Sequence, residues 1–376
     1  MSYLEQHCIK VRALSPVFLG VGESLTKKEY LFIPNSRRIQ FIDLKKFSAL
    51  LESKKQTSAY ENFVLGRERD LYRWMVSRNF TQKEIRSVQS YCIDAGNTLD
   101  RQSETGSRTK GIQLFIKDPE KRPYIPGSSL KGAIRTAILA SMLTDKNNDT
   151  RLEIFQRALE KKRKNFKREA NDLENEMLNT LKYYNRQGRV VSANDADTSV
   201  MKGIQISDGS PLNQNCLTLC EKIDIDTKGN EKRPNIFREC IRPGTVSEHL
   251  LTLNTQILAE SNLNVSAILN AIRCFSRIQN EFFYSKFPKL SEDDVSPSDG
   301  CELYLGGGSG FVSKTLLYPM FHEKALELTA EIMQSHFPKQ HHHERDVSLG
   351  VSPHMEKYTQ YDGKFYRMGR CEIKIS

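Results

Sequence analysis

Residues 122–139 constrain the fold most, because within a few residues they turn an extended chain into a helix. Two prolines keep the backbone extended and a glycine then permits a turn. Ser128 and Ser129 follow, and their hydroxyl groups can cap the apolar-periodic segment that comes next. The sequence therefore predicts a helix that begins near Ser129.

The first turns of this predicted helix carry two cations, Lys131 and Arg135, at i, i+4 spacing. Both lie on one face, near free N–H groups and the positive end of the helix dipole, where a positive charge is unfavourable unless an anion is bound. The local chemistry leaves two interpretations open. One is a grip for a phosphate or an RNA backbone, and the other is an ordinary capped helix with solvated cations.

The charge balance favours a polyanionic partner. The 376 residues carry a net charge of +10 and have a pI near 9.1, which makes nucleic acid the first candidate. No apolar run reaches the roughly 18 residues of a membrane-spanning helix. The N-terminus resembles neither a signal peptide nor a transit peptide, so we expect a cytoplasmic protein without a membrane partner.

The eight cysteines are scattered along the chain, which indicates reduced thiols rather than a disulfide framework. Cys216 and Cys220 are the only near pair. Their spacing could suit zinc, but no second pair follows. The alternating pattern between them instead favours a strand with both side chains packed inward.

A second glycine-rich segment lies at residues 303–317, where a predicted strand runs into four glycines and then a helix-like segment. Glycines clear side chains from the backbone, so successive N–H groups can approach a phosphate. The candidate anion-binding residues here are Gly306, Gly307, Gly308, Ser309, Gly310 and Lys314. The spacing is not that of a P-loop or a Rossmann fingerprint, and a flexible loop without a ligand is the alternative.

The remaining pattern predicts alternating strands and helices. Residues 5–14 read as a strand with Arg12 on its outer face, residues 60–95 as helical, and residues 150–190 as a charged helical insertion. Residues 200–208 read as a strand whose antiparallel partner is residues 217–225. Residues 97–110 and 291–300 have the composition of exposed loops. The basic run at residues 161–168 is interpreted as a solvated helix face in preference to an RNA contact.

No local pattern demands an enzyme, a metal or a cofactor. Consecutive histidines at 341–343 point in different directions, so they rarely share one metal, although His336, His354 and Asp346 are near in sequence. Three aspartates, at positions 195, 197 and 208, could act in RNA cleavage. None of the three has a neighbour that distinguishes it from an ordinary loop carboxylate.

Three segments in their order and spacing resemble the RAMP superfamily of CRISPR-associated RNA-binding proteins. They are SPVFLGVGE at residues 15–23, YIPGSSLKGAIR at 124–135 and GGGSG at 306–310. FRECIRPGT at 237–245 and the closing His-rich region narrow the resemblance to the type III-A effector subunit that caps the filament at the 3′ end of the CRISPR RNA.

The resemblance implies an α+β fold of two ferredoxin-like, RRM-related domains with helical insertions. The expected boundaries are residues 1–245 and 246–376, with the helical insertion at about 150–190. It also implies a non-catalytic RNA-binding subunit in antiviral defence that holds the 3′ part of the guide and supports its 3′ maturation. The implied partners are CRISPR RNA, target RNA, the other RAMP backbone subunits and host nucleases.

At one position the residue type differs from that of the family's endonucleases. Those that process CRISPR RNA typically carry a histidine in the N-terminal segment where this chain has Phe18, and a phenyl ring cannot transfer a proton. Phe18 can either stack on a base or pack in the core, and a RAMP-type endonuclease remains the alternative function. The predicted RNA-binding residues are Arg12, Phe18, Ser128, Ser129, Lys131, Arg135, Gly306, Gly307, Gly308, Ser309, Gly310 and Lys314.

Overall fold

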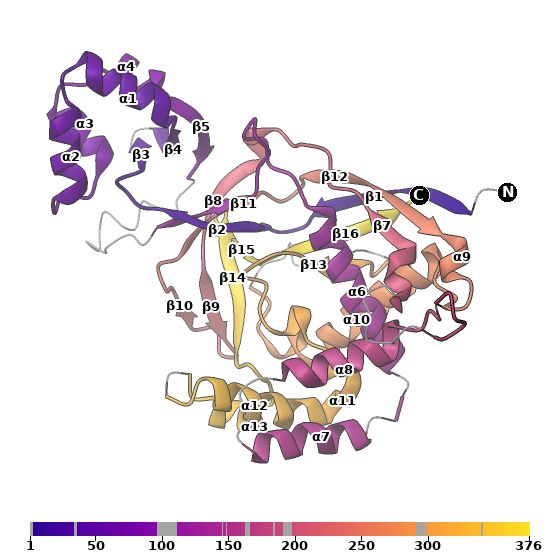
Figure 1. The fold of residues 1–376 in the computed structure, drawn as a ribbon. Helices are drawn as coiled ribbons and strands as arrows, with labels where there is room; N and C mark the ends of the chain where they lie inside the picture. Colours follow the sequence, from indigo (N-terminus) through magenta and orange to yellow (C-terminus); the bar gives the residue numbers. More distant parts are fainter. Residues whose placement is uncertain are drawn as a thin grey trace.

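The architecture combines three β-sheets with helices that cover them (Figure 1). The computed structural model describes residues 3–33, 36–95, 111–144, 146–147, 149–161, 166–182, 185–190, 198–290, 297, 299–339 and 341–376. This arrangement confirms the α+β prediction. Two ferredoxin-like domains, and their division at residue 245, stay predictions.

The five-stranded sheet has the N-terminal strand at its centre. Its order is β13 (Glu302–Tyr304), β16 (Arg370–Ile375), β1 (Leu4–Ala13), β12 (Val246–Asn254) and β7 (Ile204–Ile206). Within β1, Ile9 is aligned with His249 on one side and with Ile375 on the other, both antiparallel. Hydrogen bonds of this sheet therefore cross the boundary expected at residue 245.

Two long helices accompany this sheet, α6 (Gly127–Thr144) and α10 (Val265–Phe282), and they contact each other. Helix α6 begins two residues earlier than the sequence predicted. The reason is a cap from a distant strand end, since the carboxylate of Asp208 accepts a hydrogen bond from the Gly127 amide at 2.8 Å. A Cβ atom at Gly127 would lie 2.3 Å from the carbonyl oxygen of Ile206, so only glycine fits at this crossing.

The largest sheet has seven strands. Its order is β2 (Gly20–Leu25), β6 (Ile112–Phe115), β11 (Phe237–Ile241), β8 (Leu217–Glu221), β5 (Gln89–Asp94), β4 (Arg38–Ile42) and β3 (Tyr30–Ile33). Cys216 and Cys220 are both buried free thiols, which confirms the inward-packing interpretation.

The predicted pairing of residues 200–208 with 217–225 is wrong. Strand β7 pairs with β12, whereas β8 pairs with β11. The segment 217–225 is divided between β8 and β9 (Ile223–Asp226), which belong to different sheets. Alternation of apolar residues identifies a strand's buried face but does not identify its partner.

Strand β9 belongs to a four-stranded sheet that joins the middle of the chain to its end. The order is β10 (Glu231–Lys232), β9, β14 (Met355–Tyr361) and β15 (Lys364–Arg367). The shorter helices of the C-terminal half are α9 (Thr255–Leu258), α11 (Leu317–Phe321), α12 (Ala325–His336) and α13 (Asp346–Leu349).

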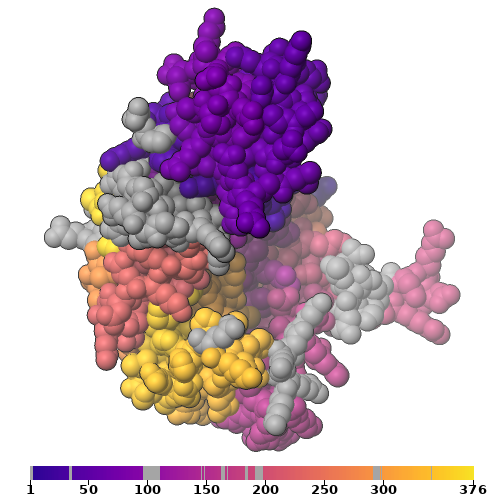
Figure 2. Space-filling view, turned by 90° about the vertical axis from the view of Figure 1, so that its left-hand side faces the viewer, coloured from indigo at the N-terminus to yellow at the C-terminus, as the bar shows by residue number. Residues whose placement is uncertain are grey.

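Residues 26–95 form a lobe that projects from the body of the molecule, at the upper left of Figure 1 and at the top of Figure 2. Its helices are α1 (Leu44–Ser53), α2 (Thr57–Leu65), α3 (Leu71–Ser77) and α4 (Gln82–Ser87), and they surround a separate core that contains Trp74. The prediction of helix throughout residues 60–95 is wrong for β5. There Tyr91 stacks on Phe41 of the neighbouring strand at 4.4 Å, and this cross-strand contact stabilises a strand.

The predicted helical character of residues 150–190 is confirmed by α7 (Asp149–Glu160) and α8 (Lys167–Leu178), while their status as an insertion in a domain stays a prediction. Phe155 of α7 contacts both Phe166 and Phe321, so the insertion shares the main core. The loop at 97–110, most of the connector at 291–300, residues 162–164 of the basic run, and the aspartates at 195 and 197 lie outside the described residues. Among the described helices, none is both long and apolar enough to cross a membrane.

Candidate nucleic-acid interface

A groove of about 800 Å³ opens where the chain after β1, the start of α6 and the glycine-rich loop meet. Segments far apart in the sequence form its walls. The lining residues are Phe18, Leu19, Gly20, Gly22, Glu23, Ser24, Gln113, Ile116, Tyr124, Pro126, Ser128, Ser129, Asp208, Gly306 and Gly307. The structure thus brings together the three segments on which the sequence analysis depended.

The glycine-rich loop lies directly against the backbone of Phe18. The amide of Gly307 donates to the carbonyl oxygen of Phe18 at 2.8 Å. Gly306 has a φ of +79°, and a Cβ atom there would lie 1.9 Å from the same oxygen. A side chain at Gly306 is therefore excluded by both backbone conformation and space.

The polar residues of the loop divide into internal and exposed ones. Ser309 is buried, and its hydroxyl lies 3.2 Å from the Gly306 carbonyl oxygen and 2.9 Å from the Ser313 hydroxyl. These contacts hold the loop in shape. Lys314, in the short 3-10 turn Val312–Lys314, is exposed and available to a ligand.

Arg238 is a site residue that the sequence analysis missed. Its guanidinium carbon lies 5.4 Å from the ring centre of Phe18, and its Nε atom donates to Gln113 Oε1 at 2.9 Å. A Cβ atom at Gly308 would lie 2.6 Å from Arg238 Nη1, so the loop approaches this cation closely. Within the described residues Arg238 forms no ion pair, and burial lowers the pKa of its guanidinium.

The signal for Arg238 was present in the sequence as a cation inside an apolar strand, at the second position of FRECI. Phe18, by contrast, is buried with Cys220, Cys240 and Met368. Its ring packs in the core and also lines the groove. Its role in RNA binding stays a prediction.

Lys357 of β14 lies at the other end of the loop, 3.3 Å from the position of a Cβ atom on Gly310. Its ammonium donates to Asp224 Oδ1 at 2.8 Å, and Lys222 pairs with the other oxygen of the same carboxylate at 3.0 Å. Burial lowers the pKa of Lys357, and the Asp224 carboxylate opposes that effect. Two cations therefore share one carboxylate beside the loop, which leaves an excess of positive charge.

The cations of α6 are occupied within the protein. Lys131 donates to the carbonyl oxygen of Met201 at 2.9 Å, and burial followed by the neighbouring Arg135 charge lowers its pKa. Arg135 forms an ion pair with Glu174 of the insertion. Contact of these two cations with RNA stays a prediction, while the ion pair of Arg135 shows how α6 is joined to α8.

Of the other predicted residues, Ser128 and Ser129 line the groove. Arg12 lies on the exposed side of β1 and pairs with Glu372 of β16 at 2.8 Å. Of the histidines, His343 and His354 meet at Asp346, whereas His336 bonds to the carbonyl oxygen of Ile332 within its own helix.

Comparison with known proteins identifies relatives in sequence and in fold. A protein from Mycobacterium tuberculosis with the description "CRISPR system Cms protein Csm5" is 27% identical over 391 residues. The match covers 100% of this chain and 98% of that protein. A protein of the same description from Streptococcus thermophilus is 27% identical over 315 residues, covering 82% of this chain and 79% of its own length.

Two solved structures share the fold. One is a chain of the cryo-EM structure of a Csm–crRNA–target RNA ternary complex in a type III-A CRISPR-Cas system, with a TM-score of 0.64, 18% identity and coverage of 98% of this chain and 100% of that one. The crystal structure of T. onnurineus Csm5 gives a TM-score of 0.62 at 19% identity and covers 96% and 99%. The family model of the RAMP superfamily matches residues 10–310, so this chain belongs to the RAMP superfamily.

Proposed function

We propose that this chain is a non-catalytic RNA-binding subunit of a type III-A CRISPR ribonucleoprotein. It binds the 3′ part of the CRISPR RNA, caps the filament of backbone RAMP subunits and supports 3′ maturation of the guide by host nucleases. Its relatives of the Csm5 description and the RNA-containing complex of similar fold support this assignment. The two ferredoxin-like domains inferred from the family belong to the same proposal.

The observation that carries the proposal is the half-buried guanidinium of Arg238 beside a glycine-rich loop, which forms no ion pair within the described part of the chain. A cation that is partly removed from water without an ion-pair partner is unfavourable on its own. A phosphate at the loop supplies that counter-ion, because the lack of a side chain at Gly308 lets the loop backbone approach Arg238 Nη1 closely. Lys357 and the exposed Lys314 extend the positive charge along the same loop.

The described lining of the groove also fits a binding role. It contains two carboxylates, Glu23 and Asp208, and no histidine. Asp208 is engaged with the first amide of α6, so it acts there as a helix cap. Phe18 occupies the place where the family's processing endonucleases carry their histidine.

The test is binding of labelled single-stranded RNA that ends in the 3′ part of a guide, with Arg238→Ala compared to wild type. The control is Arg73→Ala, which removes the same charge from an exposed site on α3. Arg238→Ala is expected to weaken binding and to lower the salt slope by about 0.7, the value for one phosphate contact with a single strand. Equal binding by Arg238→Ala and wild type contradicts a phosphate site at Arg238.

Incubation of the protein with guide RNA in Mg²⁺, in Mn²⁺ and in EDTA distinguishes a non-catalytic subunit from the alternative, an RNA endonuclease. A non-catalytic subunit leaves the RNA intact in all three. Cleavage that survives repurification of the protein overturns the non-catalytic assignment. A protein-only scaffold, in which the basic charge serves solubility, predicts no salt-sensitive RNA binding at all.

A further inference from the structure

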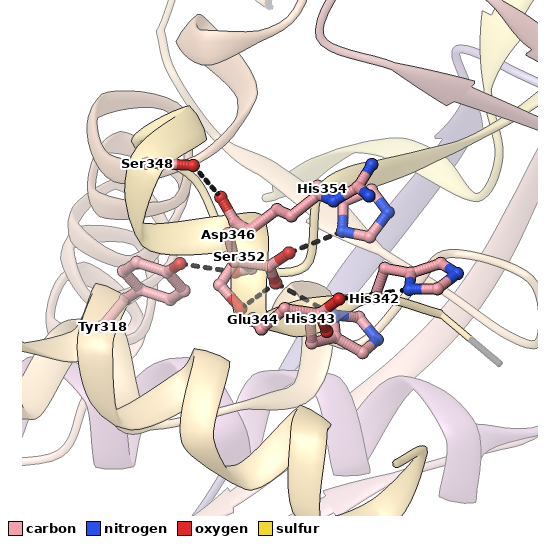
Figure 3. A network of polar contacts seen from close by, with 9 residues as sticks. Tyr318, His342, His343, Glu344, Asp346, Ser348, Ser352 and His354 are labelled. Carbon is pink, nitrogen blue, oxygen red and sulfur yellow. Dashed lines mark hydrogen bonds and ion pairs between the residues drawn. The ribbon is translucent and has the colours of Figure 1, made fainter. Parts of the chain in front are cut away.

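Asp346, the first residue of α13, is fully buried and accepts hydrogen bonds from three side chains (Figure 3). His343 Nδ1 lies 2.9 Å from Oδ2, His354 Nδ1 lies 2.5 Å from Oδ1, and the Ser352 hydroxyl donates to Oδ2 at 2.6 Å. Burial alone raises the pKa of a carboxyl group. Here the hydrogen bonds from His354, Ser352 and His343 outweigh burial and hold the pKa of Asp346 below its ordinary value.

The two imidazoles lie close to each other as well as to the carboxylate. Their ring centres are 5.2 Å apart, and one ligand atom from each of His343, Asp346 and His354 lies within 4.8 Å of the others. Two imidazoles bound to one tetrahedral Zn²⁺ at about 2.0–2.1 Å have ring centres about 5 Å apart. The observed separation therefore needs little adjustment to hold an ion.

We propose that His343, His354 and Asp346 form a binding site for a divalent transition metal of the zinc class. Two nitrogens and one carboxylate oxygen are a donor set that Zn²⁺ accepts readily. On binding, each imidazole changes to the tautomer that carries its proton on Nε2, by exchange with water, so that Nδ1 is free to bind the ion and no net proton is released. The nitrogen–oxygen separations then open to about 3.3 Å, the edge of a tetrahedron with bonds of about 2.0–2.1 Å.

The surroundings already hold these ligands in place. Ser352 donates to Asp346, and the carbonyl oxygen of Ser352 accepts a hydrogen bond from Tyr318 Oη at 2.5 Å. Such outer contacts orient the first ligands of metal sites. The side chain of His354 is 18% exposed and that of His343 is 7% exposed, so an ion and a fourth ligand from water can enter at His354.

The run of three histidines offers its own internal control. His342 is 64% exposed and bonds to Glu344, away from the Asp346 carboxylate. His341 is near His343, with ring centres 5.8 Å apart, but it stands outside the three-residue cluster. The site therefore depends on His343 and not on the other two members of the run.

The experiment uses the untagged full chain, stripped of metal with a chelator and then titrated with Co²⁺ and with Zn²⁺. Wild type and His342→Ala are expected to bind one equivalent and to show the visible absorption of tetrahedral Co²⁺. The double variant His343→Ala with His354→Ala is expected to lose both signals. His354→Gln, which preserves the size of the side chain, is the second variant if the double variant does not fold.

The eight cysteines give a second possible source of metal binding, and absorption separates the two. Nitrogen and oxygen ligands to Co²⁺ produce no thiolate charge-transfer band, whereas cysteine ligation produces an intense one. The proposal is overturned if wild type binds no ion at one equivalent, if a thiolate band accompanies binding, or if His354→Gln binds as tightly as wild type. In those cases the cluster is a hydrogen-bonded network only.

Discussion

The guanidinium of Arg238 lies over the ring of Phe18, 5.4 Å from its centre, and this pair connects the seven-stranded sheet to the glycine-rich loop. An arginine on an aromatic face gains some attraction, but less than an ion pair supplies to a half-buried cation such as Arg238. Arg238 is therefore expected to lower the free energy of unfolding of the RNA-free protein, and this effect can be measured.

Arg238→Met is expected to raise the free energy of unfolding of the RNA-free protein by about 1 kcal/mol or more, because an apolar side chain needs no counter-ion. The same variant is expected to bind RNA more weakly. Urea unfolding and RNA titration on one preparation check both parts. A loss of stability without a loss of RNA affinity assigns Arg238 to the core instead.

Gly306→Ala tests how closely the loop fits against the Phe18 backbone. The residue has a positive φ, and the new methyl group overlaps the Phe18 carbonyl oxygen, so we expect a loss of more than about 2 kcal/mol. Gly132→Ala is the matched control, since nothing lies within 4 Å of its Cβ position on α6. That control should gain about 0.5–1 kcal/mol from helix propensity. Similar denaturation midpoints for the two variants contradict the fit.

Lys131→Ala combined with Arg135→Ala tests the predicted role of α6 in RNA retention or complex assembly. We expect weaker retention with an intact fold, because the partly exposed ion pair between Arg135 and Glu174 contributes only about 0.2–1 kcal/mol. Glu174→Ala is the control, since it breaks the same ion pair and keeps both cations. If Glu174→Ala weakens retention equally, the effect comes from the α6–α8 contact. Unfolding of the double variant assigns the cations to structure.

His249 predicts a specific loss of stability in acid. Its side chain is buried between Ser247 and Ser207, and burial lowers its pKa, while the hydrogen bond to the Ser207 carbonyl opposes the shift. The unfolded chain therefore binds the proton first, so this contribution is complete above the ordinary histidine pKa of about 6.5 and is lost as the pH falls below it.

The measurement is urea unfolding at pH values of about 7.5 and about 5.5, on either side of that pKa, for wild type and His249→Gln. Wild type should lose more stability than the variant over this interval. The exposed His342→Gln should behave like wild type. Equal losses in wild type and His249→Gln contradict the prediction.

Local periodicity predicted several of the regular elements, although β5 was predicted as helix, and it did not predict contacts between residues distant in sequence. Strand β1 and the helices α7 and α8 follow from apolar spacing and lie where the pattern indicated. The cap of α6 by Asp208 could not be predicted, because it depends on two segments 81 residues apart meeting at a strand end. The same limit explains why the predicted partner strand of β7 was wrong.

The candidate site was predicted in outline for a similar reason. Glycine-rich turns can be recognised in a sequence, since few other residues permit the positive φ angles of these turns. Arg238 could not be recognised as a site residue in this way, because a single cation within an apolar strand more often projects to solvent. Only the order of strands in the sheet places Arg238 against Gly308. His343 and His354 likewise needed the fold to bring them to one carboxylate.

The central position of β1 also governs how the chain is made. This strand precedes both of its neighbours, β12 and β16, in the chain, so it is translated before either of them. The nascent chain must therefore carry β1 without these partners until β12 and then β16 have been made. A chain that is truncated between β12 and β16 leaves one edge of β1 open to aggregation.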